Sequence, residues 1–115
     1  MLPIECGCSV NGNRAVLQLQ ADASLFWFQG HFPGLSVLPG VAQLDWVMHY
    51  ATTLLATGKR FRAVENIKFQ KPVAPNSRLQ LELDWDEAKL RLSFRYILLS
   101  ENGEQNASSG KVQLC

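Results

Sequence analysis

The chain has 115 residues, enough for one domain with one hydrophobic core and too short for two, so we expect a single domain over residues 1–115. Hydrophobic residues make up 47% of the sequence and charged residues 18%, a composition typical of an ordinary globular domain. The formal net charge of +1 argues against a nucleic-acid-binding protein, and no apolar run approaches the roughly 20 residues that a membrane-spanning helix needs.

The N-terminal residues and the cysteines point to a reducing compartment. Residues 1–5 lack the basic region and the long apolar run of a signal peptide, so we expect a cytoplasmic protein. The three cysteines are an odd number, which favours free thiols. Cys6 and Cys8 form a C-x-C pair with no second pair of ligands nearby, so we expect no metal site.

The N-terminal region has the pattern of a β-hairpin. Residues 14–20 alternate, with Ala15, Leu17 and Leu19 on one face. Together with residues 3–9 they predict two strands joined by a turn around Asn11-Gly12. Leu25-Phe26-Trp27-Phe28 follows as an aromatic run, which we expect to pack in the core and in part to line a pocket.

The next segment, residues 28–34, reads Phe-Gln-Gly-His-Phe-Pro-Gly and predicts a loop that holds one histidine. Its two glycines permit backbone angles that other residues avoid, and its proline fixes one φ angle and restricts the residue before it. Such a loop can keep His31 in one place. A single histidine in a loop is more often a surface residue than a catalytic one, so the loop alone does not assign a function.

Leu38-Pro39-Gly40 has the pattern of a helix start, and the helical pattern then continues from Gly40 to about residue 56. Proline is tolerated in the first helical turn because its missing N–H is not needed there. The unpaired N–H groups of that turn, that of Gly40 among them, form a partly positive site that suits an anion or a polarised carbonyl.

An apolar stripe runs along this helix and predicts the face that meets the core. Its members recur at helical spacing and are Val41, Leu44, Met48, Ala51 and Leu55, with Val47 and Leu54 widening the stripe. Asp45 falls about 40° from Val41, at the border of the stripe, so we expect its carboxylate to be partly buried and able to hold or share a proton. His49 follows one turn later on the same side. Trp46, Tyr50 and Ala42 occupy the remaining faces, which predicts a helix enclosed by other structure.

Thr57-Gly58-Lys59-Arg60 ends the helix with a glycine followed by basic residues. Lys59, Arg60 and Arg62 form a small basic cluster. This cluster is either a solvated helix end or a docking site for an acidic partner protein.

The remaining sequence predicts four strands, at residues 63–70, 79–85, 90–96 and 105–114, with a hairpin turn at 101–104. One apolar helix followed by strands with one polar face predicts a two-layer α+β domain, a curled antiparallel sheet wrapped around one long central helix. A sheet of this size leaves an open edge, and pairing two such edges would produce a dimer.

Several of these residues together resemble a known family. Gly30-His31-Phe32-Pro33, then Pro39-Gly40-Val41, then an acidic residue at position 45 resemble the 3-hydroxyacyl-[acyl-carrier-protein] dehydratases of the hot-dog fold. Residues 69–75, Phe-Gln-Lys-Pro-Val-Ala-Pro, extend the resemblance. Within the family, residues 41–46 are most similar to the small dehydratases of aryl-polyene gene clusters.

The resemblance implies a role for each matching residue. His31 would be the general base that removes a proton from C2 of the acyl chain, and Asp45 would assist loss of the C3 hydroxyl group. The backbone N–H of Gly40 would bind the thioester carbonyl, and Phe32, Val41 and His49 would contact the substrate. The histidine and the acid of one site would come from two subunits of a homodimer or of a heterodimer with another hot-dog chain. The substrate would be carried on the phosphopantetheine of an acyl-carrier protein, with no further cofactor and no metal.

This chemistry is compatible with the residue types. A histidine suits proton abstraction near neutral pH, a protonated carboxyl suits departure of the hydroxyl group, and a helix-terminal N–H stabilises charge on the carbonyl oxygen. Two positions depart from the family pattern. Position 45 is aspartate, where many elongation-cycle relatives have glutamate, and position 49 is histidine, where glutamine is common.

Two alternatives stay open. A hot-dog thioesterase would aim a water molecule at the thioester carbon, and the loop and helix-start pattern favours dehydration over this reaction. A non-catalytic hot-dog subunit would bind acyl chains or shape a partner. Such subunits commonly lose one catalytic residue, whereas this chain has both His31 and Asp45.

Overall fold

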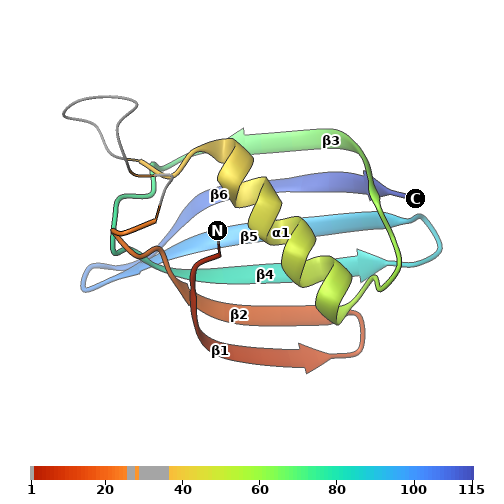
Figure 1. The fold of residues 1–115 in the computed structure, drawn as a ribbon, viewed down its shortest axis with the longest axis horizontal. Helices are drawn as coiled ribbons and strands as arrows, with labels where there is room; N and C mark the ends of the chain where they lie inside the picture. The colour runs from red at the N-terminus through yellow and green to blue at the C-terminus, as the bar shows by residue number, and fades with distance from the viewer. Residues whose placement is uncertain (1, 26–27, 29–36) are drawn as a thin grey trace.

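In the computed structural model, residues 2–25, 28 and 37–115 are described, and one helix lies across one face of an antiparallel sheet (Figure 1). The elements along the chain are β1 (Ile4–Asn11), β2 (Arg14–Gln20), α1 (Gly40–Leu54), β3 (Phe61–Phe69), β4 (Arg78–Asp86), β5 (Arg91–Ser100) and β6 (Gly103–Leu114). This arrangement confirms the predicted α+β class and the hot-dog architecture of sheet and central helix. No helix in the described part of the chain is both long and apolar enough to cross a membrane.

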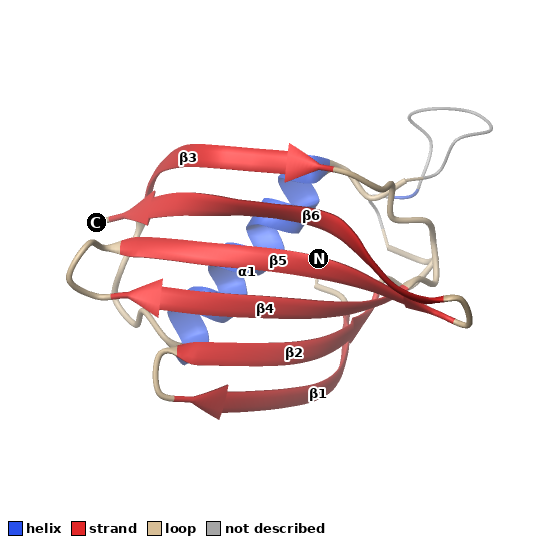
Figure 2. Ribbon diagram, turned by 180° about the vertical axis from the view of Figure 1, so that it is seen from behind, coloured by secondary structure: helices blue, strands red, loops and turns tan. Residues whose placement is uncertain are grey.

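The strands form a six-stranded sheet in the order β1-β2-β4-β5-β6-β3. Hairpins join β1 to β2, β4 to β5 and β5 to β6, and glycines with positive φ lie in or beside two of these turns, Gly12 at +60° and Gly103 at +102°. β3 follows the helix in sequence but pairs with β6, so it forms one edge of the sheet while β1 forms the other. Figure 2 shows the sheet from the side that α1 leaves uncovered.

The alternating pattern of the central strands builds the core as predicted. Register places Leu17 of β2 beside Leu81 of β4, and Leu81 beside Tyr96 of β5. All three side chains point toward the helix and are fully buried. Their polar neighbours in sequence, such as Gln80, lie on the opposite face of the sheet. The strand boundaries also agree with the predictions to within a few residues.

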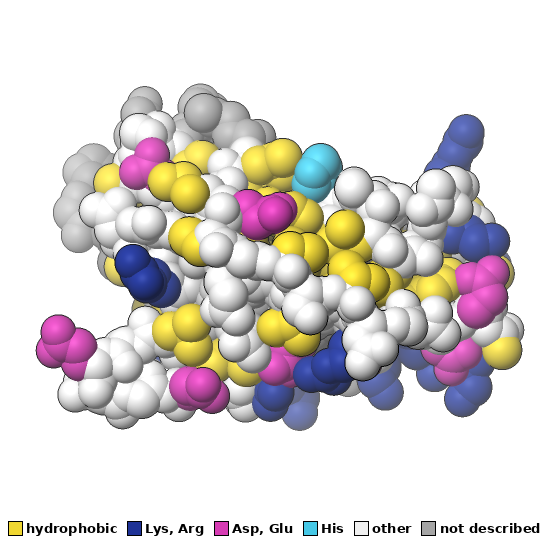
Figure 3. Space-filling view, turned by 90° about the horizontal axis from the view of Figure 1, so that it is seen from below, with side chains coloured by type: hydrophobic (Ala, Val, Ile, Leu, Met, Phe, Trp, Pro, Cys, Tyr) yellow, Lys and Arg dark blue, Asp and Glu magenta, His cyan; other side chains and the backbone are white. Residues whose placement is uncertain are grey.

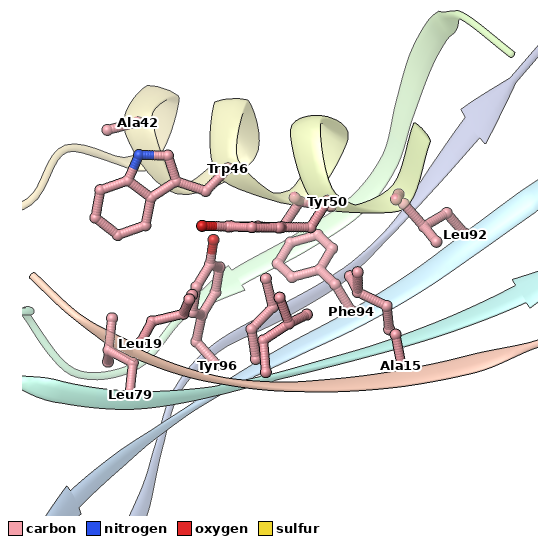
Figure 4. Close-up of a cluster of buried hydrophobic side chains, with 14 of the residues drawn as sticks. Ala15, Leu19, Ala42, Trp46, Tyr50, Leu79, Leu92, Phe94 and Tyr96 are labelled. Atoms are coloured by element: carbon pink, nitrogen blue, oxygen red, sulfur yellow. The ribbon is translucent and has the colours of Figure 1, made fainter. Parts of the chain in front are cut away.

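The helix presents to the sheet a face that only partly coincides with the predicted stripe. Its buried residues are Ala42, Gln43, Trp46, Val47, Tyr50 and Ala51. Trp46 and Tyr50 project from α1 toward the sheet, where Tyr96 points back at the helix (Figure 4). By contrast Val41 is 65% exposed, and Leu44 and Met48 are only half-buried. The predicted stripe is therefore wrong at Val41, because the large aromatic rings fill the space above the sheet instead. It is confirmed at Val47 and Ala51, which are fully buried, and Leu44 and Met48 pack partly against the core.

This orientation leaves an outward helix face, which we define as Val41, Leu44, Asp45 and Met48.

β3 also carries apolar side chains that stay exposed. Its residues Phe61, Val64 and Phe69 pair with Leu114, Val112 and Ser108 of β6, all fully buried on the helix side of the sheet. Yet Phe61 is 49%, Val64 42% and Phe69 57% exposed, since α1 does not cover this edge. The outward helix face and these β3 side chains form the apolar surface that the single chain leaves open.

Candidate active site

The site is built around the start of α1, which Pro39 caps. Pro39 has extended backbone angles (φ −63°, ψ 153°), and its carbonyl accepts hydrogen bonds from the N–H groups of Ala42 and Gln43. Pro39 itself makes no side-chain cap bond. The N–H groups of Gly40 and Val41 make no hydrogen bond to a described residue. Two donors at the positive end of the helix dipole are thus available to an oxygen ligand.

A close approach by Phe69 explains why position 40 is glycine. A Cβ atom at Gly40 would lie 2.6 Å from Cζ of the Phe69 ring, closer than real contacts allow. The two residues border a pocket of about 320 Å³ between the helix start and the end of β3. The residues that line this pocket include Val37, Pro39, Gly40, Gln43, Phe69 and Lys71.

Asp45 and His49 lie along the same helix and both are exposed. The prediction that Asp45 is partly buried is wrong for the single chain, because the helix turns Trp46 rather than Val41 into the core. Figure 3 shows the histidine of the described residues at the surface, beside groups of hydrophobic side chains. Asp45 thus points away from its own sheet, on the face that carries the exposed apolar side chains.

His31 and Phe32 lie outside the described residues, as do Phe26 and Trp27 of the aromatic run. Their predicted roles stay predictions. The described flanks of this loop are anchored in the core, since Phe28 is 9% and Leu38 3% exposed. The expectation that the aromatic run packs in the core is confirmed for Leu25 and Phe28.

The basic cluster lies at the other end of α1 from Gly40. The 15 residues of the helix separate the two ends by about 22 Å at the usual rise per residue. Lys59 is 3.9 Å from a carboxylate oxygen of Glu87, and the backbone of Arg60 pairs with that of Cys115. Both interpretations of the cluster, a solvated helix end and a docking site for an acidic carrier protein, stay predictions.

Two residues near the site had no role in the sequence prediction. Gln43 is a polar residue on the buried face of the helix, and Phe69 contacts the helix start from β3. Gln43 is recognisable in sequence as the polar member of a set with Trp46, Val47 and Tyr50 at helical spacing. For Phe69, the only sequence signal is its place at the head of the 69–75 segment. Among the described residues, no three His, Cys, Asp or Glu side chains converge to hold a metal ion, and Cys6, Cys8 and Cys115 are free and exposed.

Comparison with known proteins places this geometry in a family. One solved structure, the dehydratase heterocomplex ApeI:P from Xenorhabdus doucetiae, contains a chain that is 50% identical, with a TM-score of 0.93 over 100% of this chain and 99% of that one. A dehydratase domain of the polyketide PpsC from Mycobacterium tuberculosis shares the fold (TM-score 0.73, 20% identity, 99% of this chain and 43% of that one).

Among curated proteins, the 3-hydroxyacyl-[acyl-carrier-protein] dehydratase FabZ of Erythrobacter litoralis is 39% identical over 75 residues. That match covers 57% of this chain, and it spans 50% of the length of the relative. The model of the ApeI-like family, described as ApeI dehydratase, matches residues 7–111. The chain therefore belongs to the ApeI-like family of dehydratases.

Proposed function

We propose that this protein dehydrates a 3-hydroxyacyl thioester carried on an acyl-carrier protein to the trans-2-enoyl thioester, in fatty acid or polyene-type biosynthesis. The observation that carries the proposal is the helix start, where Gly40 and Val41 offer N–H groups that no described residue bonds, on the same helix as the outward-facing Asp45. Family membership supports it, because the matching family is one of dehydratases.

The spacing on the helix suits a β-hydroxy thioester. Gly40 and Asp45 are five residues apart, which is about 7.5 Å along a helix axis. In a 3-hydroxyacyl thioester, the C1 oxygen and the C3 hydroxyl group can each form one hydrogen bond. Two protein groups bound in this way would be separated by a distance of this order. The thioester oxygen would accept from Gly40, and the hydroxyl group would face Asp45.

In the proposed reaction, His31 takes the proton from C2, and the electron pair of that C–H bond forms the C2–C3 double bond. The bond from C3 to oxygen breaks, and the hydroxyl group leaves as water with a proton supplied by Asp45 directly or through a water molecule. The proton on His31 then returns to Asp45, which restores both groups. Negative charge on the thioester oxygen is greatest in the transition state, where the helix-terminal N–H stabilises it.

The exposed surface supports a second hot-dog subunit as partner. Asp45 lies within the outward helix face, so a subunit that covers this face would enclose the carboxylate and exclude water from it. One of the similar structures is named as a heterocomplex of two chains. We propose that the site is completed by a partner subunit, either a second copy or a different hot-dog chain, with the acyl-carrier protein delivering the substrate. No further cofactor enters this reaction.

The test is to incubate the purified protein with 3-hydroxyacyl thioesters of acyl-carrier protein and of coenzyme A, without added metal, and to follow the products by mass spectrometry. We expect loss of one water from the acyl group by the wild type. His31→Ala and Asp45→Asn should each lower the rate by at least about 100-fold, since general acid–base groups contribute 10²–10⁴-fold.

Asp84→Asn is the matched control, because Asp84 is an exposed aspartate on the uncovered face of the sheet. It should leave the rate unchanged. Loss of the whole acyl group would show a thioesterase instead. A folded wild type that changes neither substrate would contradict the enzymatic proposal and favour a non-catalytic acyl-binding subunit.

A further inference from the structure

Gln43 is a polar side chain in the core, 4% exposed, three residues into the helix from Gly40. Burial of an amide costs free energy unless its donors and acceptors find partners. The other residues on this face of α1 are apolar or aromatic, so the core would accept a leucine of similar size. The hydrogen bonds of Gln43 therefore show what the amide contributes that a leucine at this position could not.

These contacts join the helix start to two strands. The Ser108 hydroxyl on β6 donates to Gln43 Oε1 at 2.7 Å, and Gln43 Nε2 donates to the carbonyl of Leu38 at 3.4 Å. The Tyr96 hydroxyl on β5 donates to the backbone carbonyl of Gln43 at 2.6 Å. Ser108 and Tyr96 are both fully buried.

The partners also fix which way the amide points. With oxygen and nitrogen exchanged, Gln43 Oε1 would face the Leu38 carbonyl, and two acceptors would meet. The Tyr96 hydroxyl keeps its proton in the neutral range and so can donate to the Gln43 carbonyl. Burial raises the pKa of its phenol well above the ordinary value, and the electrostatic influence of Tyr50 and Asp45 adds to the effect.

The segment that Gln43 holds is the one that sets the helix start. The N–H of Leu38 donates to the Val73 carbonyl at 2.8 Å, so Leu38 is tied on one side to Val73 and on the other to Gln43. Pro39 and Gly40 follow directly. Pro39 makes no side-chain cap bond, and Gln43 bonds to Leu38 from inside the helix.

We infer that Gln43, oriented by Ser108 and Tyr96, is a positioning residue that holds the Gly40 N–H in place for the thioester carbonyl. This inference rests on the proposed function. A preformed donor stabilises the developing oxyanion without reorganisation during the reaction. Loss of the Leu38 tether lets the first turn of α1 shift, and the effect is greatest in the transition state, where the carbonyl carries most charge.

The test compares Gln43→Leu, Ser108→Ala and Gln43→Glu with the wild type in the dehydration assay, at a temperature where each is folded. We expect Gln43→Leu and Ser108→Ala to lower kcat about 10- to 100-fold, with KM within about threefold of the wild type and an unchanged pH profile. In Gln43→Glu, the introduced carboxyl can donate to the Leu38 carbonyl only when protonated. The ratio of its kcat to that of the wild type should therefore rise as the pH falls, while the ratio for Gln43→Leu stays constant.

Gln18→Leu is the matched control. Gln18 Nε2 donates to Gln80 Oε1 at 3.0 Å on the far face of the sheet, so this change removes a half-buried glutamine bond away from the helix. It should leave kcat unchanged. If Gln43→Leu and Ser108→Ala match Gln18→Leu in kcat per folded molecule, the inference is wrong although the proposed function stands.

Hydrogen exchange separates the inference from the proposed function. The amides of Ala42 and Gln43, or of residue 43 in the variants, bond to the Pro39 carbonyl and report opening of the first turn. We expect faster exchange at these amides in Gln43→Leu and in Ser108→Ala than in Gln18→Leu, relative to amides of the central strands. Equal exchange overturns the inference even where the wild type proves inert as a dehydratase.

Discussion

Because Phe69 lies so close to Gly40, adding even one carbon atom to the side chain at position 40 would cause a clash. A methyl group at this position has no room while the Phe69 ring keeps its place. The ring is 57% exposed and can move outward, so a larger residue at position 40 is compatible with folding. Substitution of Gly40 should therefore change the geometry of the pocket more than the free energy of unfolding.

Gly40→Ala should lower kcat/KM about 10- to 100-fold, because small displacements at a reacting centre have effects of this size. The free energy of unfolding should stay within about 1 kcal/mol of the wild-type value, since alanine favours the helix by roughly that amount. Both quantities are measured by steady-state kinetics and urea unfolding. Adding Phe69→Ala should restore part of the activity relative to Gly40→Ala alone, and no recovery would contradict a steric cause.

At the level of single residues, the sequence located the helix start and Asp45 but not their surroundings. Pro39-Gly40 is recognisable because proline and glycine have definite backbone preferences. Ser108 is not, since its place opposite Gln43 depends on the pairing of β6 with two strands from other parts of the chain. The burial of Asp45 was predicted wrongly because it followed from the wrong choice of helix face.

Among the elements, strands were easier to predict than the helix face. Alternating residues of a strand lie on one of two faces of the sheet, and in β2, β4 and β5 the polar residues identify the face that points to solvent. In α1 nearly every residue is apolar, so the periodicity could not show which side meets the sheet. The large side chains of Trp46 and Tyr50 determine which face of α1 packs on the sheet, and a hydrophobic pattern contains no information on side-chain volume.

On the uncovered face of the sheet, charged side chains from three neighbouring strands interact with one another. Glu82 of β4 accepts hydrogen bonds from Arg95 of β5 at 2.7 Å and from Gln80 at 2.8 Å, and Arg14 of β2 lies 3.5 Å away. Burial alone would raise the pKa of the Glu82 carboxyl. The bonds from Arg95 and Gln80, with the charges of Arg95 and Arg14, outweigh burial and hold the pKa below its ordinary value of 4.5.

Glu82→Gln should therefore lower the free energy of unfolding by about 1–3 kcal/mol near neutral pH. A carboxyl whose pKa is lower in the folded state stabilises the fold above the unfolded pKa, and this contribution is lost as the pH falls through the folded pKa. The difference between wild type and variant should thus shrink below about pH 4.5, as measured by urea unfolding across the acid range. Glu101→Gln, at an exposed turn, is the control and should leave the free energy of unfolding near neutral pH unchanged. A difference that is constant with pH would contradict the assignment.

For the whole molecule, the two edges of the sheet differ in what lies beside them. The β3 edge adjoins the outward helix face and carries Phe61, Val64 and Phe69 on the helix side. The β1 edge carries exposed apolar residues as well, among them Val10 at 46%. We propose that the partner subunit binds at the β3 edge, because Phe69 on this edge meets the helix start at Gly40.

Val64→Glu should weaken association at least about tenfold, equivalent to about 1.4 kcal/mol, because a partner would bury the new charge. Sedimentation equilibrium of the protein, alone and with a hot-dog partner, measures this constant. Val10→Glu is the matched control, since Val10 and Val64 are similarly exposed on opposite edges. Weakening by Val10→Glu alone would place the interface at β1 instead.

The sheet order also has a consequence for how the chain folds. Pairs between β3 and β6 join positions from 39 residues apart, Phe69 with Ser108, to 53 apart, Phe61 with Leu114. The hairpin of β4 and β5 can form early because its contacts are local, whereas β3 has no strand to pair with until β6 has docked on β5. Ser108 lies on β6 and completes the bonds of Gln43. Phe69 of β3 also reaches Gly40 at the helix start, so we expect the pocket beside the helix start to be completed only when β3 has paired with β6.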